Sequence, residues 1–176
     1  MFVRQINIQT MSILQILALL VFVFGCSGNN TVPGERIVDQ GRDHILPGET
    51  HVPYESSPAT SGPHYTHPYA PAPWGIYDLA LPDEVVVHNL EHGGIGIYYD
   101  CPDGCPDLVD ELESVVNDAL IDGLKIIMLP YSNVGSTISL AAWNFIDKFE
   151  HFNQDRIELF INAHESSPNA PEYMAR

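Results

Sequence analysis

The sequence predicts an α+β domain with a mostly antiparallel sheet of about four strands and with two helices on one face. After residue 83, short β-branched runs alternate with two apolar patterns of helical period, in the order β-β-α-β-β-α. Residues 33–82 are rich in Pro, Gly, Tyr and His and show neither period. Because repeated prolines exclude helix and central strand, we expect this stretch to be a long, ordered, extended N-terminal wrap on the domain.

The first 26 residues have the pattern of an export signal. Arg4 precedes an apolar run from Met11 to Gly25, which is shorter than the roughly 20 residues that a membrane-spanning helix needs. The run ends at Cys26, in a sequence that resembles a bacterial lipobox. We therefore expect a lipoprotein signal peptide over residues 1–25, palmitate-type lipid on Cys26, and a lipid-anchored, extracytoplasmic location in the cell envelope. A plain secretory signal or an uncleaved anchor is the alternative.

The rest of the chain is expected to form one domain. Small and polar residues after Cys26 are typical of a flexible tether, which we place at residues 26–36. A single globular domain is expected over residues 37–172, followed by a tail at residues 173–176.

The charge of the chain excludes one class of partner. Lys and Arg number 7 against 23 Asp and Glu, which gives a formal net charge of −16. With so few cations to replace phosphate counterions, the chain is not expected to bind nucleic acid. An acidic surface attracts cations instead, and the 8 histidines supply the side chain that binds metals most often.

The predicted elements follow from local patterns. Residues 84–89 (EVVVHN) and 94–100 (GIGIYYD) are strand-like on either side of Gly93 and Gly94, which predicts a hairpin. The later patterns alternate between helix and strand: a helix from Pro106 to Gly123, strands over residues 124–131 and 137–145, and a helix capped by Asn153 that ends before Pro168.

The strongest site candidate is the motif His88-Asn-Leu-Glu91-His92. On a helix, two histidines four residues apart share a face and chelate zinc, while the glutamate activates water. The strand signals around the motif argue against that version, because in an unbroken strand the two histidines would stand roughly 13 Å apart. We therefore expect the chain to fold back between them, as the adjacent glycines permit.

A third metal ligand is expected from the wrap, where Pro63 presents His64 on a rigid backbone. The predicted metal site consists of His64, His88 and His92, with Glu91 as a ligand or as a group that orients one. Further candidate ligands are His44, His51 and His67. Because neutral imidazole must coordinate, affinity should be lost below about pH 6. The alternative is a hydrogen-bonded network that holds the wrap on the sheet.

Cys101 and Cys105 form a second constellation, after a strand and just before a helix. Their spacing is compatible with a disulfide or with a dithiolate for a soft metal. Export to an oxidising compartment favours the disulfide, which would connect the strand to the helix.

Three segments carry a resemblance to a known family, namely TSGPHY (60–65), PWGIYD (73–78) and VHNLEHGGIGIYY (87–99). They resemble the bacterial family of domain of unknown function 3105. The likeness extends from about residue 37 to residue 172 and includes LAAW (140–143) and PE (171–172). It implies an exported domain and brings no established activity.

A shorter segment, GIGIYYDCPDGCPDLVDEL (94–112), is similar to the strand–CPDxCP–helix segment of Sco copper-delivery proteins. This resemblance implies a thioredoxin-like fold as the alternative architecture. It also implies Cys101 and Cys105 as copper-binding thiolates, and it moves the expected metal from zinc towards copper.

Three functions remain open from the sequence. The preferred one, which is not enzymatic, is a membrane-anchored lipoprotein that binds copper, or else zinc, and passes it to a metal-receiving envelope protein. The second is a metal-dependent hydrolase with Glu91 as the general base. The third is a non-catalytic interaction module of the envelope, in which the histidines form a structural network.

Overall fold

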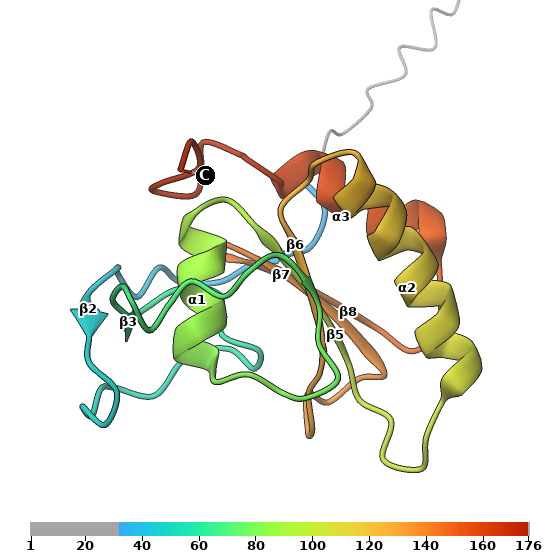
Figure 1. The fold of residues 1–176 in the computed structure, drawn as a ribbon, viewed down its shortest axis with the longest axis horizontal. Helices are drawn as coiled ribbons and strands as arrows, with labels where there is room; N and C mark the ends of the chain where they lie inside the picture. Colours follow the sequence, from blue (N-terminus) through green and yellow to red (C-terminus); the bar gives the residue numbers. More distant parts are fainter. Residues whose placement is uncertain (1–31, 176) are drawn as a thin grey trace, which may run out of the picture. The chain divides into compact units, whose positions relative to one another are not determined.

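A mixed sheet lies between α1 on one face and α2 and α3 on the other (Figure 1). The computed structural model describes residues 32–175, which belong to one compact unit, Thr31–Arg176. In chain order the elements are β1 (Glu35–Arg36), β2 (His44–Ile45), β3 (His64–Tyr65), β4 (Gly75–Ile76), α1 (Asp83–Glu91), β5 (Ile95–Tyr99), α2 (Pro106–Ile121), β6 (Ile126–Pro130), β7 (Ile138–Ala142), β8 (Phe145–Phe149) and α3 (Gln154–His164).

The larger sheet has six strands in the order β1-β8-β7-β5-β6-β4. β4, β6 and β5 are parallel to one another, with α2 connecting β5 to β6. β7 runs antiparallel to β5, β8 forms a hairpin with β7, and β1 adds to the edge of β8. A separate two-stranded sheet pairs β2 with β3 in parallel.

Both faces of the larger sheet are buried, and successive residues of one strand serve opposite faces. In β6, Ile126 and Met128 pack with α2 and α3, whereas Ile127 and Leu129 pack with α1. Strands that are buried on both faces consist of continuous apolar runs, as this one does. The α1 face is the one that carries the histidines.

The predicted four-stranded sheet with two helices is wrong. Residues 32–175 form six strands in one sheet, two more in a second, and three helices. The main error is the run after Pro82, which forms α1 and not the first strand of a hairpin. Neither the four-stranded sheet nor the thioredoxin-like alternative describes the whole of this architecture.

The three valines at the start of α1 misled the prediction, because β-branched residues favour strands when local preference alone decides. In a helix such a residue costs only a few tenths of a kcal/mol against better helix formers, and burial outweighs that cost. Val86, Val87 and Leu90 all face the sheet from α1. Asp83 and Glu84 in the first turn complement the helix dipole.

The other helices form where the local patterns place them. α2 begins at Pro106, and Gly123 follows it. α3 begins after Asn153, whose side chain accepts a hydrogen bond from the Arg156 amide. The last strand was missed because a turn at Asn144, with φ at 63°, divides the apolar run after residue 137 into β7 and β8.

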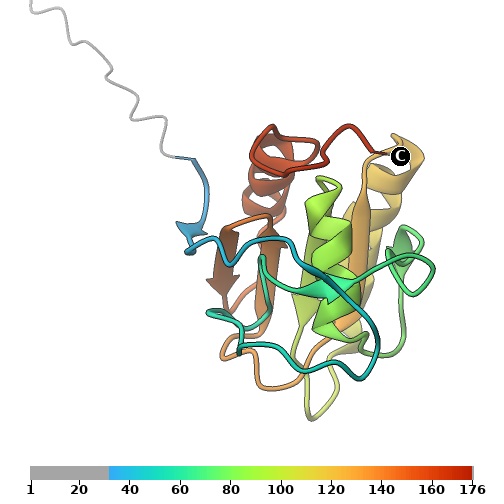
Figure 2. The ribbon, with the colours of Figure 1, turned by 90° about the vertical axis from the view of Figure 1, so that its left-hand side faces the viewer.

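The wrap follows an extended path across α1, so this helix is covered by the sheet on one side and by the wrap on the other (Figure 2). Its short strands β1 and β4 pair with opposite edges of the larger sheet. No helix within residues 32–175 is both long and apolar enough to cross a bilayer. The predicted signal peptide and Cys26 lie outside the described residues.

Candidate metal centre

α1 presents the HNLEH motif as a helix, so His88, Glu91 and His92 lie at positions i, i+3 and i+4 of one face. The ring centroids of His88 and His92 are 4.8 Å apart. The prediction that the motif is extended and folds back on itself is therefore wrong. The helix brings the two rings together without any reversal of the chain.

Two glycines end α1 and begin β5 without a loop. The Gly93 amide donates to the Leu90 carbonyl, and the Gly94 amide to that of Asn89. A Cβ atom on Gly94 would lie 2.4 Å from the Trp74 ring, so any side chain at this position would clash. This tight turn fixes the motif against the sheet.

A buried amide holds the wrap onto the same helix. Asn89 Oδ1 accepts from the Ala72 amide at 3.0 Å, and Asn89 Nδ2 donates to the Ala72 carbonyl at 2.8 Å. The Asn89 side chain therefore makes the same two hydrogen bonds to the Ala72 backbone that a residue of a neighbouring strand would make. Because Asn89 is fully buried, this pair fixes the distance between wrap and helix.

The wrap supplies two histidines through the register of its small parallel sheet. β2 and β3 place His44 opposite His64. The ring centroid of His64 lies 4.7 Å from that of His44 and 5.0 Å from that of His88. Residues far apart in the chain thus form one cluster of rings.

Two groups of side chains in this cluster can hold a metal ion. One consists of His44, His64 and His88, and the other of His88, Glu91 and His92. Within each group, one ligand atom per residue lies within 4.8 Å of the others. His88 belongs to both groups.

Backbone carbonyls orient the two buried rings. The Nδ1 atom of His64 lies 2.8 Å from the Gly62 carbonyl, and that of His88 lies 2.6 Å from the Tyr65 carbonyl. A carbonyl can only accept, so each Nδ1 carries the proton. Metal-binding histidines are typically fixed in this way through their second nitrogen, which leaves Nε2 for the ion.

Glu91 is the acidic partner of these rings and is fully buried. Its Oε2 atom lies 3.0 Å from Nε2 of His64 and 3.8 Å from Nε2 of His44. Two ligands that each lie about 2.0–2.2 Å from a tetrahedral ion are about 3.3–3.6 Å from each other. The distances from Glu91 to His64 and to His44 lie just below and just above this range. Its Oε1 atom is also buried, and it has no hydrogen-bond partner among residues 32–175.

The contact between Glu91 and His64 has room for one proton or one metal ion. If His64 carries its proton on Nδ1, then its Nε2 lone pair faces a carboxylate lone pair at 3.0 Å, and the two repel. A proton or a metal ion between the two atoms removes this repulsion. The same place between the two side chains therefore suits either a proton or a metal ion.

The pKa values in the cluster favour the forms that bind metal. Burial lowers the pKa of His88 and of His92, against the opposing effects of the Tyr65 carbonyl on the first and of Glu172 on the second. Burial alone would raise the pKa of Glu91, but the hydrogen bond from His64 and the neighbouring histidines outweigh it and lower that pKa. Neutral imidazoles and an ionised carboxylate are the states in which these groups coordinate metals.

The C-terminal segment packs against the end of α1. The Glu172 amide donates to the Glu91 carbonyl, and Lys125 Nζ donates to the carbonyls of His92 and Tyr173. Oε2 of Glu172 lies 3.4 Å from Nε2 of His92. The partly exposed side chain of Glu172 therefore lies beside the His88–Glu91–His92 group, next to His92.

The remaining histidines lie outside the two groups. Nε2 of His51 is 3.2 Å from Glu84 Oε1, and His67 is exposed. His164 packs against Phe145 and Phe160 and hydrogen-bonds to the Pro33 carbonyl, which is a core role.

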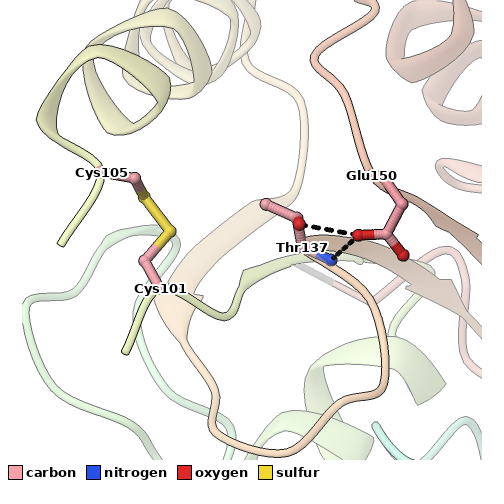
Figure 3. Close-up of a disulfide and its surroundings, with 4 residues drawn as sticks. All are labelled: Cys101, Cys105, Thr137 and Glu150. Carbon is pink, nitrogen blue, oxygen red and sulfur yellow. Dashed lines mark hydrogen bonds between the residues drawn. A yellow bond between two sulfur atoms is a disulfide. The ribbon is translucent and has the colours of Figure 1, made fainter. Parts of the chain in front are cut away.

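Cys101 and Cys105 form a disulfide between the end of β5 and the start of α2, near the hydrogen-bonded pair Thr137–Glu150 (Figure 3). In this oxidised form neither sulfur is a thiolate ligand. The loop also lies apart from β2, β3 and α1 (Figure 1). The candidate metal centre thus consists of imidazole and carboxylate donors.

The comparisons with known proteins identify a family. The family described as "Protein of unknown function (DUF3105)" matches residues 46–176, well over half of the chain. The chain belongs to this family. Neither a curated protein nor a solved structure matches it. The resemblance to the DUF3105 family is therefore confirmed, and the matched range contains every residue of the two metal groups except His44.

Proposed function

We propose that this member of the DUF3105 family is a membrane-anchored lipoprotein of the cell envelope that binds one transition-metal ion through its histidine cluster. The single observation that carries the proposal is the buried contact between His64 Nε2 and Glu91 Oε2 at 3.0 Å. When the proton between them is replaced by a metal ion, an imidazole nitrogen and an ionised carboxylate at that distance supply two ligands of a four-coordinate site. His44 and His88, which form a metal group with His64, would supply the other ligands.

The donor set supports copper(II) first and zinc second. Imidazole and carboxylate suit both metals, and copper(II) binds more tightly than zinc to a given site of this kind. In an oxidising compartment copper is present as copper(II), which does not require thiolates. The proposal therefore does not depend on the cysteine pair.

The acidic charge and the lipid fit the same role. A net charge of −16 raises the local concentration of cations around the site. Lipid on Cys26, with the tether that follows it, would hold the domain close to the membrane surface. A second metal-binding protein of the envelope would receive the ion.

The proposal does not extend to hydrolysis. A general base must reach a water or substrate proton, whereas the Glu91 side chain is fully buried and already contacts His64. Nothing in the geometry favours the hydrolase over a binding protein.

The test of metal binding uses the full-length protein produced with its own export signal. Equilibrium dialysis against micromolar copper(II) or zinc, followed by elemental analysis, should give one ion per chain. His88→Ala should abolish binding, because His88 belongs to both groups. His51→Ala is the matched control: His51 is also a wrap histidine beside a carboxylate, and its loss should leave binding unchanged. A wild-type chain that stays metal-free refutes the proposal.

The lipid is tested separately. Labelled palmitate should be incorporated into the wild-type protein and not into Cys26→Ser, which should appear in the soluble fraction. Equal labelling of the two proteins would refute lipid attachment at Cys26 and would leave the metal proposal intact.

A further inference from the structure

The two metal groups overlap at one histidine. We call the group of His44, His64 and His88 the wrap position, and the group of His88, Glu91 and His92 the helix position. The wrap position combines β2, β3 and α1, whereas the helix position lies within one helical turn and its cap. His88 links the two positions.

His88 cannot bind two ions at once. Its Nδ1 atom is 2.6 Å from the Tyr65 carbonyl and carries the proton that this contact requires. Only Nε2 remains as a ligand. An ion at the wrap position and an ion at the helix position therefore compete for the same atom.

Glu91, in contrast, has two carboxylate oxygens in different surroundings. Oε2 faces the wrap histidines, at 3.0 Å from His64 and 3.8 Å from His44. Oε1 is buried and has no hydrogen-bond partner in the described part of the chain. A buried carboxylate oxygen without a donor is costly unless a cation binds it. This unpartnered oxygen belongs to a residue of the helix position.

Each position combines buried side chains with a more exposed one. The side chains of His64 and Glu91 have no exposed surface, whereas that of His44 is 43% exposed. In the helix position, His92 is 13% exposed, and its partner Glu172 is 45% exposed. The wrap position thus opens to solvent at His44, and the helix position opens at His92 and Glu172.

We infer that the centre binds a single ion in two alternative positions and that the ion passes between them by exchanging its other ligands around His88. This inference rests on the proposed metal binding. Glu91 follows the ion with its second oxygen, and Glu172 faces the outer side of the helix position. An ion taken up at one exposed end can thus be released at the other, as transfer to a receiving metal-binding protein requires.

The first measurement is stoichiometry. The full-length protein is titrated with copper(II), and bound copper is measured by dialysis and by electron paramagnetic resonance. The expected result is one ion per chain at saturation. Two ions per chain, at separate sites of the cluster, would overturn the inference and would leave the proposed function standing. Failure of the wild-type protein to bind copper would instead refute the proposed function.

The second measurement is the rate at which bound copper transfers to excess EDTA. His92→Ala removes the helix position, so the ion should stay at the wrap position and leave more slowly, by roughly tenfold or more, the scale on which supporting residues change metal sites. Loss of an ordinary ligand would instead speed release. Glu172→Gln changes an exposed side chain and should also slow the release of copper. This variant provides the readout if His92→Ala folds poorly.

The two outcomes of the kinetic test are distinct. Slower release from His92→Ala or Glu172→Gln, with copper stoichiometry and the His51→Ala control unchanged, supports the two-position centre. Unchanged or faster release from both variants overturns it. His44→Ala adds a check on the other end, because its copper should remain bound at the helix position with an altered resonance spectrum.

Discussion

Nε2 of His64 lies 3.0 Å from Oε2 of Glu91, and both side chains are completely buried. One residue comes from a two-residue strand of the wrap and the other from α1. The contact therefore has a structural role and a chemical one. It attaches the wrap to the helix, and it provides two ligand atoms that can share one proton or one metal ion.

Substitution of Glu91 should separate these two roles. Glu91→Gln should change the free energy of unfolding of the metal-free protein by less than about 1 kcal/mol, because the amide still hydrogen-bonds His64. Glu91→Ala should cost about 2–3 kcal/mol, because a buried ring nitrogen loses its partner. Urea unfolding followed by circular dichroism measures both values, and both variants should bind metal more weakly. Equal stability of Glu91→Ala and the wild type would contradict this account.

The metal-free protein should become less stable as the pH falls. The pKa values of His88, His92 and His164 lie below the ordinary 6.5, chiefly because these rings are buried. Below pH 6.5 the unfolded chain therefore binds more protons than the folded chain, and acid favours unfolding. Glu91 acts in the same direction below 4.5, because its folded pKa is lowered by His64 and its neighbours despite burial.

Urea unfolding at pH 7, 6 and 5, in the presence of a chelator, measures this dependence. The free energy of unfolding should decrease at each step, and His88→Gln should reduce the decrease because one depressed pKa is removed. A stability that rises or stays constant from pH 7 to pH 5 would show that these rings are not buried in the neutral form.

The site could be predicted from the sequence only in part. The spacing of His88, Glu91 and His92 and the rigid setting of His64 are local features, and all four side chains lie in the two metal groups or in direct contact with them. His44 was only a further candidate. Its place opposite His64 depends on a parallel pairing of two-residue strands, which has no local signature.

The fold was less predictable than the site, and α1 shows why. The valines before His88 favour a strand locally, and the contacts that decide otherwise come from the sheet below and the wrap above. A usable signal was present in Asp83 and Glu84, which are typical of a first helical turn. The short strands β1 and β4 had no such signal, because only their partners define them.

The Asn89 amide should contribute far more stability than a similar amide on the surface. Asn89→Ala should cost about 2–3 kcal/mol, because a fully buried amide is removed and two half-buried backbone groups of Ala72 lose their partner. Gln40 makes an equivalent exposed pair, with the Pro53 carbonyl and the Glu55 amide, and water can replace it. Gln40→Ala should therefore cost less than about 1 kcal/mol. Similar losses in the two variants would show that Asn89 does not hold the wrap.

Reduction of the disulfide should affect stability and leave metal binding unchanged. Cys101 and Cys105 are separated by 4 positions, so their bond closes a small loop worth about 2 kcal/mol in the unfolded chain. Thermal unfolding with and without a reductant measures this loss, with Cys101→Ser/Cys105→Ser as the matched variant. Reduction that creates an additional copper(I) site would instead support the thiolate role implied by the likeness to Sco proteins.

Removal of the metal distinguishes a metal centre from a purely structural histidine network. An ion at about 100 times its dissociation constant stabilises the folded chain by about 2.7 kcal/mol, which raises the melting temperature of a domain of this size by about 5–10 °C. EDTA should therefore lower the melting temperature of the copper-loaded wild type and of His51→Ala. It should leave that of His88→Ala unchanged, because this variant has lost the ligand common to both positions. If His88→Ala lowers the melting temperature by the same amount with and without EDTA, then the histidines only hold the wrap against α1.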